Sequence, residues 1–205
     1  MCYAAHKTEL SRLILERSDK DMKKTAVIFP GVGYTKDRPL LYYAGKLAVK
    51  HGYELRFVDF SGLDWSKEKL KDKEFLRITM EKCMRMTEDA LAGDTDLSGR
   101  RVVFISKSIG TVVATAYAAL KHVDATQICF SPLEMIGDHV RDSGAVLFCA
   151  DEDPYADYGS LEHIAKEKNL ELYRVKGGNH SLETGDVSTD IDNLKDMMRK
   201  VTKYL

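Results

Sequence analysis

Short apolar runs alternate with longer amphipathic patterns along most of this sequence, and that alternation restricts the fold more than any other feature. The runs lie at 25–31, 53–60, 101–106, 126–130, 145–150 and 170–175. Most of them are apolar on both faces, which is typical of strands in a parallel sheet that is covered on both sides. The segments between them carry apolar residues at three- and four-residue spacing, as covering helices do. The sequence therefore predicts an α/β fold with a mostly parallel central sheet and helices on both of its faces.

The helices are expected in the intervals between these runs. The first is capped by Asp37, has Pro39 in its first turn and closes at Gly52. Further helices are predicted at 67–92, 109–121 and 160–168 and within 187–205. The earlier segment ELSRLILERSD, at 9–19, fits a helix as well as an edge strand or hairpin, and we favour the strand.

The length and charge of the chain limit its domain organisation and the classes of partner it can have. The chain has 205 residues, 44% of them hydrophobic, so we expect one domain over residues 1–205 with a full core. Its 31 Lys and Arg residues nearly balance its 32 Asp and Glu residues, so no overall field attracts a nucleic acid or an anionic membrane. No stretch approaches the roughly 18 apolar residues of a membrane span, and the charged N-terminus lacks the apolar centre of a signal peptide. We therefore expect a cytoplasmic protein with neither nucleic-acid nor membrane partners.

The cysteine pattern argues against a metal site and against a disulfide framework. The four cysteines, at 2, 83, 129 and 149, are scattered without C-x-x-C spacing. Cys149 could act as a nucleophile, but its place inside the apolar run VLFCA favours a buried strand residue. No metal is predicted.

The segment VVFISKSIG, residues 102–110, passes from a buried strand directly into two serines, a lysine and a glycine. Ligands of an open parallel sheet bind beyond the carboxyl ends of its strands, so this change of character falls where a site is expected. SKSIG fits a tight strand-to-helix turn that needs small residues two positions before and after its central serine, here Ser106 and Gly110. Such a turn presents the Ser108 hydroxyl above the sheet and leaves the Ile109 amide free for a developing oxyanion. A serine that merely caps the helix is the simpler alternative.

At this turn the sequence resembles the α/β-hydrolase family, whose common G-x-S-x-G motif has Gly where this chain has Ser106. The resemblance runs from about residue 25 to the C-terminus, although its specific motifs cover only four short loops. It implies that a histidine and an acid activate the serine, in the chain order Ser108, Asp153, His180.

The base and the acid are chosen from the loops that follow the later strands. His180 lies in the loop KGGNH directly after the run at 170–175, and His139 is a weaker competitor. For the acid, the family pattern after the run at 145–150 favours Asp153 in ADEDP, with Asp151 as the second choice. A solvated acidic turn accounts for the remaining carboxylates of this loop.

The resemblance also implies a second oxyanion donor in the loop after VIFPG. By position this donor is the amide of Val32, beside that of Ile109. The GVG at 31–33 is otherwise an ordinary turn, because it lacks the third glycine of a dinucleotide-binding loop. The resemblance implies no metal and no organic cofactor.

The substrate site is less specified than the catalytic one. Many family members insert a helical lid where this chain has only residues 131–144, so an open site is expected. Met135 and Ile136 are candidates for an apolar wall against the substrate, or they only pack this short segment. Tyr34 lines the rim of the pocket or is an ordinary loop residue, and Trp65 fits core packing at least as well as stacking on a substrate.

We therefore expect a small, lidless serine hydrolase that cleaves a carboxylic ester or thioester of a small-molecule acyl substrate through an acyl-enzyme. Acyl transfer to an alcohol or amine uses the same three residues and stays open as an alternative. A fold retained as a binding module is a third possibility, although binding alone has no need of nucleophile, base and acid together.

Overall fold

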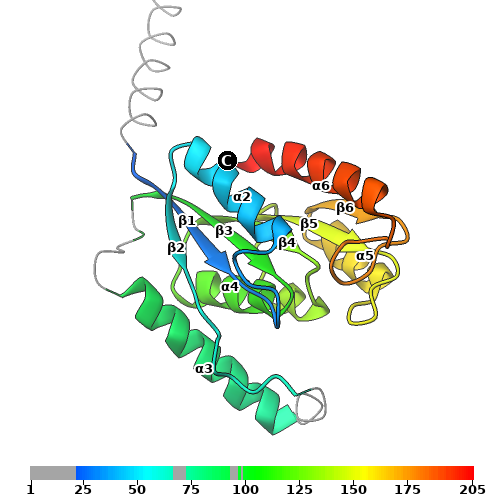
Figure 1. The fold of residues 1–205 in the computed structure, drawn as a ribbon. Helices are drawn as coiled ribbons and strands as arrows, with labels where there is room; N and C mark the ends of the chain where they lie inside the picture. Colours follow the sequence, from blue (N-terminus) through cyan, green and yellow to red (C-terminus); the bar gives the residue numbers. More distant parts are fainter. Residues whose placement is uncertain (1–21, 67–72, 93–96, 98) are drawn as a thin grey trace, which may run out of the picture.

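The computed structural model describes residues 22–66, 73–92, 97 and 99–205, and its centre is a six-stranded sheet. The strands follow the spatial order β2-β1-β3-β4-β5-β6, and every neighbouring pair is parallel (Figure 1). Each of the predicted apolar runs forms one of them, so the predicted α/β class is confirmed. Their bounds are β1 (Lys24–Phe29), β2 (Glu54–Phe57), β3 (Arg101–Lys107), β4 (Ala125–Phe130), β5 (Ala145–Ala150) and β6 (Glu171–Val175).

Helices cover both faces of the sheet, as predicted. Helices α2 (Pro39–Lys50) and α6 (Val187–Val201) pack on one face, and α3 (Lys73–Leu91), α4 (Ile109–Leu120) and α5 (Tyr158–Glu167) lie on the other (Figure 1). Two short 3₁₀ helices, Glu134–Asp138 and Thr202–Tyr204, complete the regular structure of the described residues. Between β4 and β5 the chain holds only the first of them, so no cap domain is inserted there.

The core has two layers because successive side chains of a strand point to opposite faces. In β1, Ala26 and Ile28 face α2 and α6, whereas Val27 and Phe29 face α3 and α4. All four side chains are at most 1% exposed, which explains why these four successive positions are apolar. The carboxyl ends of the strands meet at one edge of this core, and the loops after them carry the polar residues singled out in the sequence.

The start of α2 differs from the sequence prediction. Arg38, not Asp37, occupies the capping position, and its side chain makes no capping hydrogen bond. Asp37 instead pairs with Lys36 at 2.9 Å. The Leu40 amide in the first turn donates to the Tyr34 hydroxyl over 3.1 Å, so a side chain from the preceding loop satisfies a donor that Asp37 was predicted to satisfy. The predicted end at Gly52 is confirmed, because this residue follows the helix with φ of 85°.

Other predicted elements are confirmed as strand or helix, but their first and last residues differ from the prediction. Strand β2 is shorter than the run at 53–60, although Tyr53, Val58 and Phe60 are buried at its two ends. The helix predicted at 67–92 corresponds to α3, and its first six residues lie outside the described residues, as does the ambiguous segment at 9–19. None of the helices in the described ranges combines the length and apolar character needed to cross a lipid bilayer.

Candidate active site

Ser108 occupies a sharp turn between β3 and α4. Its backbone has φ of 56° and ψ of −126°, a conformation that costs a residue other than glycine about 1–3 kcal/mol. The turn brings the start of α4 against the end of β1: a Cβ built on Gly110 would lie 2.4 Å from the Pro30 carbonyl oxygen and 2.7 Å from that of Phe29. This contact explains the small residue that the SKSIG pattern requires after the serine. Although Ser108 stands at the helix start, its side chain makes no capping hydrogen bond.

His180 lies between Ser108 and Asp153 and contacts both. Its Nε2 is 2.8 Å from Ser108 Oγ, and its Nδ1 is 2.7 Å from Asp153 Oδ2. An ionised carboxylate only accepts hydrogen bonds, so with Asp153 charged the proton sits on Nδ1 and Nε2 accepts from the serine hydroxyl. Three side chains from the ends of β3, β5 and β6 thus form one hydrogen-bonded chain.

The acid of this chain is almost completely buried. The Asp153 side chain is 3% exposed and that of His180 is 21% exposed. Burial alone would raise the pKa of Asp153, but hydrogen bonds from His180 and from the Tyr155 amide, with the nearby charge of Lys107, hold it below its usual value. The carboxylate therefore stays ionised and can accept the N–H of the imidazole beside it.

Asp151, the second choice for the acid, has other partners. It accepts hydrogen bonds from the Arg174 guanidinium and, over 2.6 Å, from the Gly177 amide. The competing histidine, His139, lies at the end of the short helix Glu134–Asp138 and is exposed. The geometry therefore joins Asp153 and His180, and not Asp151 or His139, to Ser108.

The two amides predicted to bind an oxyanion come from loops that pack together at Ser108. Ile109 is the first residue of α4, where amides have no partner within the helix. Val32 lies at the tip of a tight turn closed by paired hydrogen bonds between Gly31 and Tyr34. Gly31 packs against Ser108 so closely that a Cβ on it would be 3.1 Å from the serine Cβ. The oxyanion role of Val32 and Ile109 stays a prediction.

The three predicted substrate residues have different surroundings. Tyr34 is half-buried: its hydroxyl accepts from α2, its ring lies 5.2 Å from Lys107 Nζ, and burial raises its pKa to about 12. Ile136 is completely buried with Ile109, which fits the packing alternative and leaves it no surface for a ligand. Met135 is 37% exposed and lines an apolar groove of about 810 Å³ between α3, α4 and the short helix Glu134–Asp138. A substrate contact stays a prediction for Tyr34 and Met135.

A second cavity, of about 570 Å³, lies at the carboxyl ends of β1 and β2, and Ser108 itself is not part of its lining. Gly31 belongs both to its wall and to the contact with Ser108. We call it the β2 cavity; its apolar lining is Pro30, Phe57, Val58, Phe60, Leu63 and Trp65. Trp65 was expected either to pack in the core or to stack on a substrate. It both lines this cavity and packs against the core around Ile109.

Two polar residues of the site were not singled out from the sequence. Lys107 Nζ and Ser131 Oγ both donate to the main-chain carbonyl of His180, over 2.6 and 2.8 Å. Lys107 could have been found, because a lysine directly after the apolar run at 101–106, at the end of a buried strand, is unusual. Ser131 carries no comparable signal. Among the described residues, no cluster of His, Cys, Asp and Glu side chains could hold a metal ion.

Solved structures that superpose on this fold include several α/β hydrolases. A hydrolase of the α/β superfamily from Xanthomonas campestris superposes with a TM-score of 0.62 at 14% identity, covering 88% of this chain and 99% of that one. A lidless α/β serine hydrolase from the same species gives a TM-score of 0.56 at 14% identity over 90% of this chain and 85% of that one. This chain has the α/β-hydrolase fold. An esterase from Pyrococcus furiosus with this fold matches at a TM-score of 0.62 and 14% identity, covering 91% of this chain and 84% of that one.

No protein-family model and no curated protein matches the sequence. Within the α/β-hydrolase fold, the turn at Ser108 follows the central strand β3, and both contacts of His180 come from strand ends on the same edge of the sheet.

Proposed function

We propose that this protein is a serine hydrolase that cleaves a carboxylic ester or thioester through an acyl-enzyme. The observation that carries the proposal is the double contact of His180, at 2.8 Å from the Ser108 hydroxyl and 2.7 Å from the Asp153 carboxylate. A serine hydroxyl is a weak nucleophile near neutral pH and needs a base, which in turn needs an orienting acid. The α/β-hydrolase fold, shared with hydrolases and an esterase, supports the same class of reaction.

In the first half of the proposed reaction, Ser108 Oγ attacks the substrate carbonyl carbon while His180 Nε2 takes the hydroxyl proton. The charge that develops on the carbonyl oxygen is stabilised by the amides of Ile109 and Val32, each worth roughly 3 kcal/mol in related enzymes. The tetrahedral intermediate collapses, the bond to the alcohol or thiol breaks, and His180 returns its proton to the leaving group. An acyl group remains on Ser108.

Water completes the cycle on the same atoms. His180 takes a proton from a water molecule, whose oxygen attacks the acyl carbon, and the carboxylic acid leaves as Ser108 regains its proton. Throughout, Asp153 holds the imidazole by Nδ1 and stabilises its positive form. The strained backbone at Ser108 fixes the nucleophile before substrate binds, so little reorganisation is needed during the attack.

The β2 cavity is the proposed site for the substrate's apolar group. It begins at Gly31, beside the nucleophile, and its wall of Phe57, Phe60 and Trp65 favours an aromatic or short aliphatic group. Three charged residues also line this cavity: Lys36 and Asp37 pair with each other at 2.9 Å, and Asp59 accepts hydrogen bonds from the amide and hydroxyl of Ser61. A small, uncharged acyl or alcohol group therefore suits this cavity better than a highly charged one.

The test is hydrolysis of p-nitrophenyl esters and acyl thioesters of increasing chain length by the wild-type protein and by Ser108→Ala. We expect turnover that is greatest for short or aromatic acyl groups and that falls about a millionfold in the variant. Added alcohols and amines show whether the acyl group is also transferred. Inactivity of the folded wild-type protein on the whole panel, or full activity of the variant, would contradict the proposal.

A further inference from the structure

Lys107 is a buried basic residue for which the proposed reaction has no use. It ends β3, directly before Ser108, and is 1% exposed. Burial lowers the pKa of Lys107 to about 7, against the opposing attraction of Asp153 and Glu183. A buried amine is costly and is normally retained only where it has defined partners. Its surroundings therefore indicate what it does.

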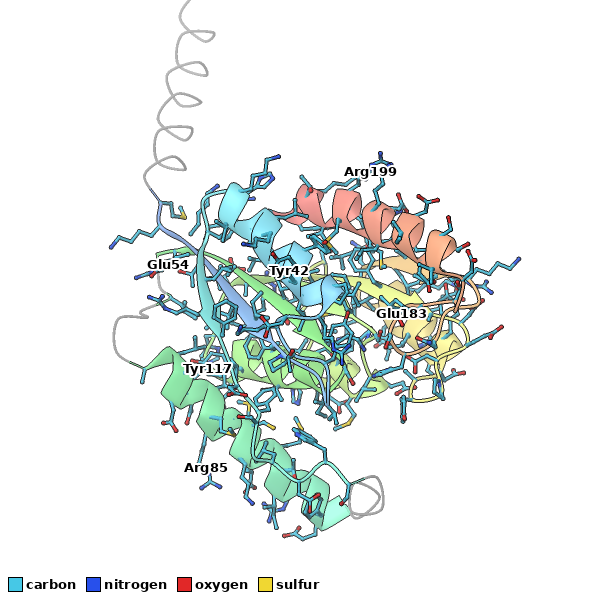
Figure 2. The ribbon with its side chains drawn as sticks, in the orientation of Figure 1. Tyr42, Glu54, Arg85, Tyr117, Glu183 and Arg199 are labelled. Carbon is cyan, nitrogen blue, oxygen red and sulfur yellow. The ribbon has the colours of Figure 1, made fainter. Side chains whose placement is uncertain are left out.

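The partners of Lys107 come from the ends of four strands. Its Nζ donates to the His180 carbonyl over 2.6 Å, and Ser131, directly after β4, donates to the same oxygen over 2.8 Å. The Tyr34 ring, from the loop after β1, lies 5.2 Å from the amine. The charged groups that act on it are Asp153 after β5 and Glu183 after β6. Figure 2 labels Glu183, on the loop between β6 and α6 that also carries His180.

The loop that carries His180 contains two glycines and is held by hydrogen bonds on both sides of the histidine. Gly177, with φ of 67°, donates its amide to Asp151 over 2.6 Å, and the Asn179 amide donates to the Glu183 carbonyl over 2.9 Å. Neither of these bonds holds the His180 carbonyl. The hydrogen bonds of His180 to Ser108 and Asp153 hold only its ring. The bonds from Lys107 and Ser131 hold its main chain. Displacement of a catalytic group by about 1 Å can lower a rate about a hundredfold, so this anchoring bears directly on the reaction.

We propose that Lys107 is a positioning residue for His180: its side-chain amine, together with the Ser131 hydroxyl, anchors the His180 carbonyl and so keeps the imidazole between Ser108 and Asp153. The inference rests on the proposed serine-hydrolase function. Lys107 itself touches neither the hydroxyl that attacks nor the carboxylate that orients the ring by any hydrogen bond between described residues. Both the ammonium and the neutral amine carry N–H groups, so the anchor persists on either side of the amine's titration.

Substitution of Lys107 separates anchoring from packing and charge. Lys107→Met keeps most of the side-chain volume and removes the donor, so we expect kcat to fall roughly 10- to 100-fold with KM unchanged. Lys107→Gln removes the charge but retains an N–H donor, and we expect it to recover most of that loss. Ser131→Ala should have a smaller effect. Because the double variant leaves the His180 carbonyl without either donor, its loss should exceed the product of the two single losses.

The experiment measures kcat and KM of these variants on the best ester, with Lys176→Met as the control. Lys176 is an exposed lysine at the start of the same loop, and its substitution should change neither constant. Thermal unfolding of each variant confirms that it is folded. Independently of turnover, the imidazole N–H proton of His180 is followed by NMR, because the hydrogen bond to Asp153 protects it from exchange. We expect this signal in the wild type and in Lys107→Gln, and its loss or broadening in Lys107→Met.

Several results would overturn the inference. A Lys107→Met protein with wild-type kcat and an unchanged imidazole signal shows that the anchor is not needed. A rise in KM alone shows that Lys107 contacts the substrate instead. Equal losses in Lys107→Met and Lys107→Gln, both folded, show that charge and not the donor matters. If the wild type has no turnover while the imidazole signal still depends on residue 107 as expected, the proposed function fails and the positioning role stands.

Discussion

The two sides of Ser108 are built in different ways. On the side of His180, hydrogen bonds join residues far apart in the chain: Lys107 and Ser131 to His180, and the Glu152 amide to the Gly178 carbonyl over 3.1 Å. On the side of the β2 cavity, the serines of the segment 59–66 bond to residues two positions earlier, as Ser61 does to Asp59 and Ser66 to Asp64. On the His180 side, hydrogen bonds join the loops after different strands. On the side of the β2 cavity, the hydrogen bonds of these serines lie within each turn.

This difference matches the demands of the two halves of the proposed reaction. Proton transfer between Ser108 and His180 requires distances held to a fraction of an ångström, so its groups come from strand ends and are anchored to each other. A substrate wall needs only shape and apolar surface, and local turns can change without disturbing the proton path. Substitutions on the His180 side should therefore lower the rate on every substrate by the same factor. Substitutions at the β2 cavity should lower it for some acyl groups and not for others.

The largest effect is expected at the acid. Asp153→Asn keeps the size of the side chain but cannot hold the imidazole in the tautomer with its proton on Nδ1, so kcat should fall about 10⁴-fold on all esters. Asp151→Asn is the matched control in the same loop; it loses part of its contact with Arg174 and should retain activity within a few-fold. Steady-state kinetics on short and long esters test this. Equal losses in the two variants would show that the loop, and not the carboxylate beside His180, is responsible.

The buried amine makes stability depend on pH. Lys107 has a folded-state pKa of about 7, below the ordinary value of 10.5. Below pH 7 it is charged in both states and the folded state bears the full cost of burial. Between about pH 7 and 10.5 the unfolded chain keeps a proton that the folded chain has lost, so the free energy of unfolding rises with pH by at most about 5 kcal/mol.

Lys107→Met lacks this dependence. Its stability advantage over the wild type should be greatest below pH 7 and should shrink as pH rises towards 10.5. Urea unfolding of both proteins at several pH values measures the difference, and groups common to both cancel. Parallel stability curves would mean that Lys107 is not titrating in the buried site. A variant that is more stable and less active would show that burial of Lys107 lowers the stability of the fold while it positions His180 for the reaction.

A smaller effect is expected at the turn itself. Gly110→Ala places a Cβ 2.4 Å from the Pro30 carbonyl oxygen, which no side-chain adjustment relieves, and should cost about 3 kcal/mol of stability. Gly45→Ala in α2 is the control, because its Cβ would meet only side-chain atoms at 3.6 Å or more and alanine favours a helix interior by up to about 1 kcal/mol. Denaturant unfolding distinguishes them. A tolerated alanine at 110 would contradict the close packing of α4 against β1.

The smallest effect, and the selective one, is expected at the cavity. Trp65→Ala should lower kcat/KM about tenfold for an aromatic or medium-length acyl group and change it little for an acetyl group, because only the larger group reaches the wall. For the larger acyl groups, the kcat/KM of Trp65→Phe should lie between those of the wild type and Trp65→Ala. An equal loss of kcat/KM on all substrates would mean that Trp65 supports the reacting groups and does not contact the substrate.

Most of the fold could be predicted from the sequence because its central strands are almost fully buried. In the run at 101–106, Val102 to Ile105 are apolar since both faces of β3 are covered, and only Arg101, at the start of the strand, is exposed. Strand β2 lies at the edge of the sheet, with mixed exposure, and there the predicted bounds were too long. Local capping was less predictable: Asp37 has the right chemistry for a cap, but the Tyr34 hydroxyl, which comes from the β1 loop, satisfies the amide of Leu40 instead.

The candidate site divides in the same way. Ser108 was indicated by a local pattern, because the turn constrains residues two positions away. The preference for Asp153 over Asp151 came from the family resemblance, because the contacts that separate the two, with His180 and Arg174, join residues distant in sequence. The anchoring of His180 by Lys107 and Ser131 joins the ends of separate strands, and only the assembled sheet brings them together.

The proposed function requires an activated nucleophile at Ser108, and covalent labelling reports on that property without a substrate. A fluorophosphonate reacts with such a serine as the P–O bond forms and fluoride leaves, and mass spectrometry of the digested protein locates the adduct. We predict one adduct, on the peptide that contains Ser108, with no labelling of Ser108→Ala and much slower labelling of His180→Ala. A folded wild-type protein that stays unlabelled, or that is labelled equally after Ser108→Ala, would contradict the account.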